Sequence, residues 1–328
     1  MERRILAGRA VGRIGLGCMN LSHAYGVPPA REVAEAVLRA ALDLGVEHFD
    51  TAALYGFGKN EALLGEVLAP HRRAFFLASK CGMTGVNGKR VIDGRPATLK
   101  ATCEESLKNL RTDHIDLYYL HRLDRTVAIE ESVGALGELV RQGKIGAIGL
   151  SEVSAATLRT AHAVHPIAAV QNEYSLWSRN PEYGLLAACD ELGVALVAFS
   201  PVARGFLAGG VRDTRFAPGD IRAGMPRFQG ENFAQNLTIL AEFEAYAAEI
   251  GVSPAQAALA WVLARGPGVH AIPGTTSVAH LREDMAEVAL SPAQLARLEE
   301  IVAPRKVAGP RYPAATQAEI DTEEAPAA

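Results

Sequence analysis

The strongest constraint on the fold is an alternation, repeated eight times, of a short apolar run with a segment of helical apolar spacing. The runs are apolar almost throughout, as expected for parallel strands that are covered on both faces. They are RIGLGCM (13–19), VEHFDTA (46–52), FFLASK (75–80), IDLYYLH (115–121), KIGAIGLS (144–151), AAVQNEY (168–174), ALVAFSP (195–201) and VHAIPGT (269–275). Strands that alternate with helices in this way predict an α/β protein of the (β/α)8 TIM-barrel class.

Helices are predicted between these runs because apolar residues recur at spacings of three and four. Val33, Ala34, Val37, Leu38 and Ala41 form one such apolar face. The predicted helices cover residues 29–44, 59–68, 98–110, 129–141, 154–163, 181–192 and 237–250, with additional helices at 253–265, 277–287 and 292–301. The Gly-rich loop 81–96 is long enough to be functional.

The domain organisation follows from the same pattern. We expect a single barrel at residues 1–303 with a long loop at about 202–236, which is either a lid or disordered. The segment 304–328 is rich in Pro, Ala and Glu, and we expect a tail that is partly disordered. A doubly wound sheet is the competing fold, but no GxGxxG opens a helix after the first strand.

Composition excludes several classes of partner. The chain has 33 basic and 37 acidic residues, a net charge of −4, so nucleic acid and anionic membranes are not expected as partners. No apolar run approaches the ~20 residues that span a bilayer, and the apolar segment near the N-terminus is too short for a secretory signal. The four cysteines show neither disulfide nor zinc spacing. We therefore expect a cytoplasmic protein.

Ionisable residues follow three successive strands. Asp50 ends the second predicted strand, Lys80 the third and His121 the fourth, while Tyr55 lies in the loop just beyond Asp50. In a parallel barrel the carboxyl ends of all strands lie on one face, so these four side chains are predicted to converge there.

The chemistry of these four residues suits the reduction of a carbonyl group. A phenol such as Tyr55 can protonate the carbonyl oxygen if a cation stabilises the phenolate that remains. Lys80 can be that cation, and Asp50 keeps the lysine protonated and oriented. His121 can donate a hydrogen bond to the same oxygen.

Each of these residues alone has an ordinary structural explanation, because strand-end Asp residues often cap, Lys residues are usually solvated and Tyr residues usually pack. Only their occurrence together at consecutive strand ends favours a catalytic role. A metal-dependent barrel hydrolase is the alternative from another class of enzyme. The nine histidines contain no HxH pair, so no metal site is predicted.

The chain resembles the aldo-keto reductases. The motifs GLGCM, DTAALYG, LASK, YYLHR, IGLSEVS, VQNEYSL, FSPVARGFL and IPGTT stand in the order and spacing of that family. EYSLW, RFQGENF and HAVHPI resemble the subgroup of pyridoxal reductases and of the bacterial and plant relatives of potassium-channel beta subunits.

This resemblance implies a reductase that transfers a hydride from NAD(P)H to an aldehyde or ketone, with Tyr55 as the general acid. It also implies a cofactor extended over the barrel mouth without a Rossmann domain. The resemblance assigns cofactor contacts to Ser151, Gln171, Phe199, Ser200, Pro201, Val202, Gly205, Leu207, Ile272, Gly274, Thr275, Thr276, His280, Glu283 and Asp284. Glu152 stands where many relatives have Asn. It is left out of the expected cofactor contacts, because a carboxylate cannot donate a hydrogen bond. Arg204 is either a charge partner of the pyrophosphate or a solvated residue.

The resemblance favours NADPH as cofactor, with NADH as the alternative. Relatives that prefer NADPH carry a basic residue where this chain has Ser277, and many end the stretch with Glu-Asn where it has Glu283 and Asp284. His280 and Arg282 are the candidates for the missing positive charge.

The substrate is expected to be a small carbonyl compound. Tyr25, Tyr55, Met83 and Trp177, with the loop at 202–236, would form an aromatic and apolar pocket, although Met83 and Trp177 are also consistent with core packing. The functional alternative is a nucleotide-binding regulatory subunit with little turnover. The oligomeric state and the physiological direction of the reaction stay open.

Overall fold

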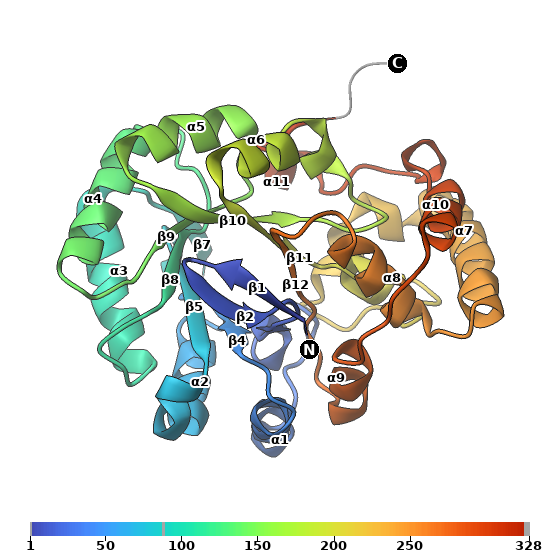
Figure 1. The fold of residues 1–328 in the computed structure, drawn as a ribbon, viewed down its shortest axis with the longest axis horizontal. Coiled ribbons are helices and arrows are strands. Elements are labelled where there is room, and N and C mark those ends of the chain that lie inside the picture. Colours follow the sequence, from blue (N-terminus) through green and yellow to red (C-terminus); the bar gives the residue numbers. More distant parts are fainter. Residues whose placement is uncertain (1, 87–88, 325–328) are drawn as a thin grey trace.

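The computed structural model describes residues 2–86 and 89–324, and its main feature is an eight-stranded parallel sheet in the order β12-β11-β10-β9-β8-β5-β4-β3. The strands are β3 (Leu16–Gly17), β4 (His48–Asp50), β5 (Phe76–Cys81), β8 (Leu117–Leu120), β9 (Ile148–Ser151), β10 (Ile167–Glu173), β11 (Ala195–Phe199) and β12 (Val269–Ile272). Figure 1 shows the helices arranged around them. The predicted (β/α)8 barrel is confirmed.

Backbone hydrogen bonds between the first and last strands close the barrel. The amide nitrogens of Gly15 and Gly17 donate to the carbonyl oxygens of Ala271 and Pro273, each at 2.9 Å. A Cβ on Gly17 would lie 2.8 Å from the carbonyl oxygen of Ile272, so this close approach requires glycine. The strand predicted at 13–19 is shorter in the structure, because only this part pairs on both sides.

The outer layer consists of helices that bury one apolar face against the strands. In α1 (Arg31–Asp43) the buried residues Ala34, Val37, Leu38 and Ala41 follow the helical repeat. The other helices are α2 (Lys59–Leu68), α3 (Pro96–Asn109), α4 (Ile129–Arg141), α5 (Ala155–Val164), α6 (Leu185–Leu192), α7 (Gly230–Glu249), α8 (Pro254–Leu263), α9 (Val278–Asp284), α10 (Pro292–Ile301) and the short α11 (Ala314–Gln317). Their placement leaves the strand ends exposed only at the two openings of the barrel.

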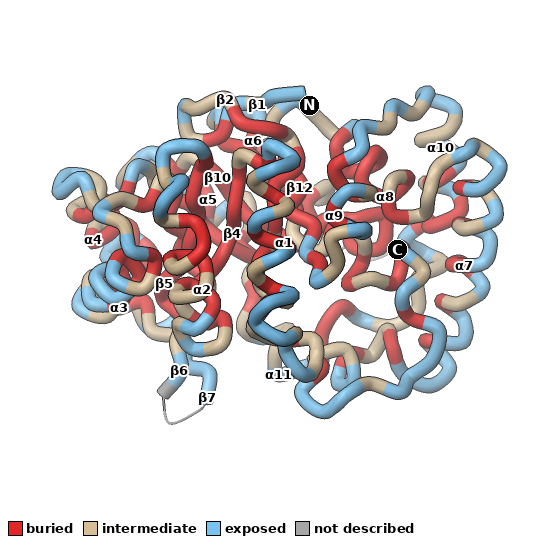
Figure 2. The backbone as a smooth tube through the Cα atoms, turned by 90° about the horizontal axis from the view of Figure 1, so that it is seen from below, coloured by how far each residue is buried: buried red, intermediate tan, exposed pale blue. Residues whose placement is uncertain are grey.

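Two antiparallel hairpins were not predicted. The hairpin of β1 (Arg3–Leu6) and β2 (Arg9–Gly12) packs Leu6 into the inner core of the barrel. A second hairpin, β6 (Met83–Val86) and β7 (Lys89–Ile92), occupies part of the loop predicted at 81–96. Figure 2 shows the two hairpins at opposite ends of the molecule. The first therefore closes one end, and the second stands beside the open mouth.

The segment predicted as a lid or as disordered, 202–236, contains short 3-10 turns, and α7 begins at Gly230 rather than at Leu237. Its aromatic residues pack together, with the rings of Trp177 and Phe206 stacked 4.2 Å apart. Phe228 also packs against Trp177, edge to face. Aromatic packing in irregular turns leaves no periodic signal, which explains the incorrect helix start.

The C-terminal segment also differs from the prediction of a partly disordered tail. Between Pro304 and Glu324 it contains a 3-10 turn and α11, and it buries Arg311, Tyr312 and Ile320. Arg311 of this segment pairs with Glu152 and Glu173, and Asp321 accepts a hydrogen bond from Ser154. The polar composition of the segment therefore does not mean that its charged side chains are solvated. The last residues, 325–328, lie outside the described part.

Candidate active site

A cavity of about 1070 Å³ opens at the carboxyl ends of the barrel strands. Asp50, Tyr55 and His121 line it, while Lys80 lies beneath them with no exposed surface. The structure thus brings together all four side chains that the sequence predicted to converge.

Lys80 and Asp50 form a buried ion pair at the base of the cavity. Asp50 ends β4 and Lys80 lies on the adjacent strand β5. Nζ of Lys80 donates to Oδ1 of Asp50 and, at 2.8 Å, to the carbonyl oxygen of Thr51. Burial alone would lower the pKa of Lys80, but Asp50 and Tyr55 outweigh it and raise that pKa, so the lysine is protonated.

Tyr55 lies directly above this ion pair. Lys80 Nζ is 5.1 Å from the centre of the Tyr55 ring, and a tight turn holds the tyrosine, with its backbone N–H donating to the carbonyl oxygen of Ala52 at 3.0 Å. Burial raises the pKa of Tyr55, and the Lys80 ammonium acts in the opposite direction. The phenol therefore keeps its proton at neutral pH.

His121 completes the group from the end of β8. Its ring centre is 5.8 Å from that of Tyr55, and the two planes are nearly perpendicular at 84°. Burial and the positive charges of Arg122 and Lys80 lower the pKa of His121 far below its usual value. The imidazole is therefore neutral, with one N–H to donate.

The next strand ends carry the residues assigned to the reactive end of a cofactor. Ser151 ends β9, Gln171 lies on β10 and Phe199 ends β11, and all three line the cavity. Gln171 Nε2 donates to Oδ2 of Asp50 at 2.7 Å, which leaves Gln171 Oε1 to accept from a ligand. Ser151 Oγ accepts from Nη1 of Arg122 at 3.3 Å.

The remaining assigned residues extend the cavity away from Tyr55. Those that line it are Ser200, Pro201, Val202, Gly205, Ile272, Gly274, Thr275, Thr276, His280, Glu283 and Asp284. Leu207 does not: its side chain is fully buried in the core, and its backbone N–H donates to Val202. The structure therefore does not bring Leu207 into the cavity with the other assigned residues, because the chain turns inward after Gly205.

Three residues of the mouth have environments that the sequence did not settle. Arg204 is buried rather than solvated and lines the cavity, and its Nη2 donates to Glu173 at 2.7 Å and to Tyr312 Oη at 2.8 Å. Met83 lines the cavity, whereas Trp177 packs on Phe206 and is not part of its wall.

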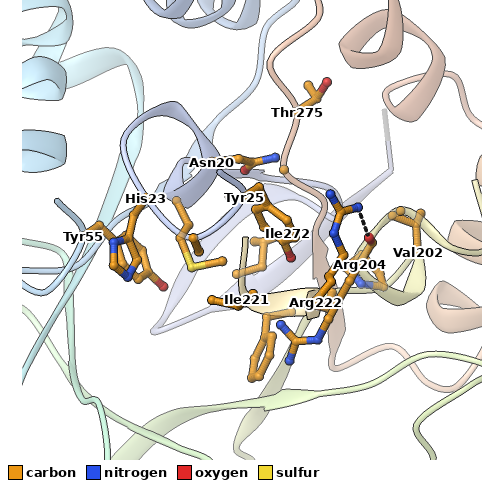
Figure 3. A pocket seen from close by; sticks show the side chains of 18 of the residues that line it. Asn20, His23, Tyr25, Tyr55, Val202, Arg204, Ile221, Arg222, Ile272 and Thr275 are labelled. Carbon is orange, nitrogen blue, oxygen red and sulfur yellow. Dashed lines mark hydrogen bonds between the residues drawn. The ribbon is translucent and has the colours of Figure 1, made fainter. Parts of the chain in front are cut away.

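Several cavity residues were not predicted individually as site residues, and most of them come from segments without a strand-end signal. They include Met19, Asn20, His23, Arg90, Arg122, Ile221, Arg222, Tyr312, Pro313 and Thr316. In Figure 3, Tyr55 and His23 lie at one end of the cavity, Val202 and Arg204 at the other, and Tyr25 and Ile272 between them. Met19 ends the first predicted strand and Arg122 follows His121 directly, while Ile221 and Arg222 lie in the loop 202–236 that was expected to help form the pocket.

The donor set fits an extended nicotinamide dinucleotide. At the end that Tyr55 lines, the cavity wall also includes the hydroxyl of Ser151 and the amide oxygen of Gln171. At the other end, Gly274, Thr275 and Thr276 line the cavity with side chains that are small or carry a hydroxyl. Gly274 is fixed by packing, because a Cβ there would lie 2.4 Å from Oδ1 of Asn20. The distant end also holds Asp284, whose pKa is raised to about 7 by burial and by Glu283.

Residues 2–86 and 89–324 contain no group of three His, Cys, Asp or Glu that could hold a metal ion. The same residues form no helix that is both long and apolar enough to cross a membrane. The cavity at the barrel mouth is thus the principal candidate site.

Comparison with known proteins agrees with this site. A model of the aldo/keto reductase family matches residues 13–303. A probable aldo-keto reductase of Glycine max is 42% identical over 310 residues, which cover 93% of this chain and 89% of the relative.

Solved structures give the same result. A glycerol dehydrogenase from Gluconobacter oxydans matches with a TM-score of 0.84 and 31% identity over 95% of this chain and 98% of its own. An aldo-keto reductase from Bacillus halodurans, solved in its holo form, matches with a TM-score of 0.77 and 26% identity over 93% and 97% of the two chains.

A third structure is an aldo/keto reductase from Klebsiella pneumoniae in complex with NADP and acetate. It matches with a TM-score of 0.73 and 28% identity over 95% of this chain and 99% of its own. Together with the barrel and the four converging side chains, these matches show that the chain belongs to the aldo/keto reductase family, whose members are oxidoreductases that act on carbonyl groups with a nicotinamide cofactor.

Proposed function

We propose that this protein reduces aldehydes and ketones to alcohols with NADPH, with Tyr55 as the general acid. The observation that carries the proposal is the buried Lys80–Asp50 ion pair directly beneath the Tyr55 phenol, at the floor of the cavity. This arrangement places a fixed cation where a phenolate would form. The reaction belongs to the class that acts on the CH–OH group with NADP.

The residues of the cavity would have different roles in this reaction. A bound reduced nicotinamide supplies a hydride to the carbonyl carbon. Tyr55 donates its proton to the carbonyl oxygen as negative charge develops there, and the Lys80 ammonium stabilises the phenolate that remains. Asp50 keeps Lys80 charged, because it raises the lysine pKa despite burial.

His121 would orient the carbonyl oxygen. The imidazole is neutral because burial and neighbouring positive charges lower its pKa, so it offers a neutral N–H donor rather than a second acid. Its ring stands nearly perpendicular to that of Tyr55. A carbonyl oxygen between the two rings would receive hydrogen bonds from both.

Ser151 and Gln171 would hold the carboxamide of the cofactor, and Phe199 would offer its ring to the nicotinamide face. Gln171 suits this role because its amide nitrogen is already engaged with Asp50, which leaves its oxygen to accept an N–H of the carboxamide. The residues from Ser200 to Gly205 would lie along the pyrophosphate, and those from Ile272 to Asp284 along the adenosine.

The proposed preference for NADPH rests on family membership more than on charge. Among the residues of 275–284, which the structure describes in full, His280 lines the cavity beside Glu283 and Asp284, while Arg282 does not line it. Ser277 caps α9, with Oγ accepting from the backbone N–H of His280. NADH therefore stays the alternative cofactor.

The substrate is proposed to be a small aldehyde or ketone, because Tyr25, Met83 and Ile221 form an apolar wall beside Tyr55. We also propose a cytoplasmic location, in keeping with four free cysteines that are all buried.

The proposal is tested by following the absorbance of the reduced nicotinamide with 4-nitrobenzaldehyde, using NADPH and then NADH. Wild type should oxidise the cofactor, and Tyr55→Phe should lose a factor of about 10² to 10⁴ in kcat. The variant should keep the cofactor Kd of the wild type, because only a hydroxyl is removed.

A wild-type protein that binds the nucleotide but turns over none of a panel of aldehydes would contradict the proposal and favour a regulatory subunit. Equal activity of Tyr55→Phe and wild type would instead remove Tyr55 from the role of acid while leaving a reductase in place.

A further inference from the structure

A buried cluster of four charged side chains joins the C-terminal segment to the barrel mouth. Glu152, Glu173, Arg204 and Arg311 are at most 8% exposed. Nη2 of Arg311 donates to both carboxylate oxygens of Glu152, at 3.0 and 2.8 Å, and to Glu173 Oε2 at 3.1 Å. Two carboxylates thus face two guanidinium groups, and Arg227 adds a third positive charge close enough to act on Glu173.

Glu152 is the member of this cluster that lies next to the proposed cofactor site. It follows Ser151 directly, and its backbone has a φ of +55°, a left-handed conformation that non-glycine residues seldom adopt. Such a conformation is unfavourable for a residue other than glycine and persists only when the surroundings fix it. The contacts of Glu152 are therefore expected to determine the path of the chain at Ser151.

The C-terminal segment supplies contacts to both the side chain and the backbone of Glu152. Arg311 binds its carboxylate, and the backbone N–H of Asp321 donates to its carbonyl oxygen at 3.0 Å. The other two partners are internal to the barrel, since the backbone N–H of Glu173 donates to Glu152 Oε1 at 2.8 Å and the backbone N–H of Glu152 donates to the carbonyl oxygen of Gln171 at 3.1 Å. Two of the four partners of Glu152 thus belong to the C-terminal segment.

The same segment reaches the loop that would lie along the pyrophosphate. Tyr312, adjacent to Arg311, lines the cavity and accepts a hydrogen bond from Arg204. Burial alone would raise the pKa of Glu173, but Arg204, Arg311 and Arg227 together lower it far below its usual value. Glu173 is therefore charged, and it holds both arginines.

We propose that Arg311 is a positioning residue for cofactor binding: it fixes Glu152 and, through the backbone, the orientation of Ser151. This inference rests on the proposed function, in which Ser151 holds the nicotinamide carboxamide. Arg311 touches neither cofactor nor substrate, so its effect is carried by the Glu152 backbone. Loss of Arg311 leaves an uncompensated carboxylate in a buried site, which is the costly way to break an ion pair.

The experiment compares Arg311→Met with Arg125→Met. Arg125 holds the same segment by donating to the carbonyl oxygens of Ala318 and Ile320, but it does not touch Glu152. Calorimetric titration should show that Arg311→Met raises the Kd of NADPH by about tenfold or more, whereas Arg125→Met changes it by less than about twofold. The KM for NADPH should rise with the Kd, while kcat and the aldehyde KM at saturating NADPH vary by less than about threefold.

A third variant, Glu152→Gln combined with Arg311→Met, tests whether Arg311 affects cofactor binding through Glu152. Removing both charges should restore part of the affinity lost in Arg311→Met, because no unpaired carboxylate remains at residue 152. A double variant that binds no better than Arg311→Met would assign the effect elsewhere and overturn the proposed route.

An Arg311→Met protein that is folded and binds NADPH with a Kd within about twofold of wild type overturns the inference, even if its Tm is lower. Where Arg311→Met does not fold, Arg311→Gln, which keeps hydrogen-bond donors but removes the charge that compensates Glu152, is judged by the same criterion. A wild-type protein that binds neither NADPH nor NADH overturns the proposed function and this inference together. Titration of the wild-type protein with the two cofactors distinguishes this outcome from a failure of the inference alone.

Discussion

Gln171 Nε2 donates a hydrogen bond of 2.7 Å to Oδ2 of Asp50, the carboxylate whose other oxygen binds Lys80. A residue assigned to hold the cofactor thus shares an acidic partner with the cation that supports Tyr55. Both side chains are almost completely buried, at 2% exposure each. The cofactor contact and the proton-donating machinery are therefore expected to respond together when Gln171 is changed.

Gln171→Leu should impair both binding and turnover. An unsatisfied buried oxygen on Asp50 costs about 1–3 kcal/mol, which corresponds to a loss of roughly tenfold to a hundredfold in kcat, and the cofactor Kd should rise as well. Ser151→Ala is the matched control, because Ser151 has no contact with Asp50 and its change should raise the Kd alone. Titration and single-turnover rates measure the two quantities. A Gln171→Leu enzyme with a wild-type kcat would show that Asp50 does not need this donor.

Replacement of His121 should separate hydrogen bonding from proton transfer. Because the imidazole is neutral, His121→Asn, which keeps an N–H donor, should retain kcat/KM within about tenfold, whereas His121→Ala should lose about 10² to 10³. The depressed pKa of His121 also predicts that wild-type kcat/KM shows no histidine titration between about pH 6 and 8. A pH–rate profile with a limb in that range that disappears in His121→Asn would contradict a neutral donor.

Asp284 should make stability depend on pH. Its pKa is raised from 3.8 to about 7, so between these values the folded protein keeps a proton that the unfolded chain has released. Stability therefore falls as the pH rises through this window. Asp284→Asn should exceed wild type by up to a few kcal/mol in free energy of unfolding near pH 8, and the two should converge near about pH 4, as measured by urea denaturation.

Glu283→Gln is the matched control for Asp284, because the Glu283 charge contributes to the raised pKa. Glu283→Gln should narrow the pH range over which the stability of the folded protein falls, without abolishing this pH dependence. If the free energies of unfolding of Asp284→Asn and wild type differ equally near about pH 8 and near about pH 4, the effect comes from packing rather than from ionisation.

Gly274→Ala should disturb the distant end of the cavity. The added Cβ would lie 2.4 Å from Oδ1 of Asn20 and 2.8 Å from the carbonyl oxygen of Gly17, and overpacking of this kind costs about 1–3 kcal/mol. Gly268→Ala, just before the opposite end of β12, is the control, since its Cβ would meet no atom within 4 Å. Thermal denaturation and the cofactor Kd should change in the first variant and not in the second.

The four converging residues were predictable because Asp50, Lys80 and His121 stand at or beside strand ends in a repeating pattern, and Tyr55 lies in the loop just beyond Asp50. Strand order and the common direction of parallel strands then decide where Asp50, Lys80 and His121 lie, and no information about side-chain packing is needed. Leu207 was assigned by the family resemblance instead, and its place depends on how the chain turns after Gly205.

The cluster around Glu152 was not predictable from the sequence. Glu152 and Arg311 are 159 residues apart, and neither stands in a periodic segment that would indicate its partner. The composition of the C-terminal segment predicted partial disorder, whereas Arg311 is paired with Glu152 and Glu173 on the barrel mouth. Ion pairs between irregular segments leave no local signal, so the packing of this segment had to come from the structure.

The seam between the first and last barrel strands has a consequence for biosynthesis. The backbone N–H groups of Gly15 and Gly17 donate to the carbonyl oxygens of Ala271 and Pro273, near the other end of the chain. A ribosome must therefore release most of the polypeptide before the barrel can close, and until then β3 presents an unpaired edge. Contacts of such long sequence separation form slowly, and exposed edges invite aggregation. The nascent protein is thus most in need of a chaperone after Lys80 and His121 have emerged and before β12 arrives.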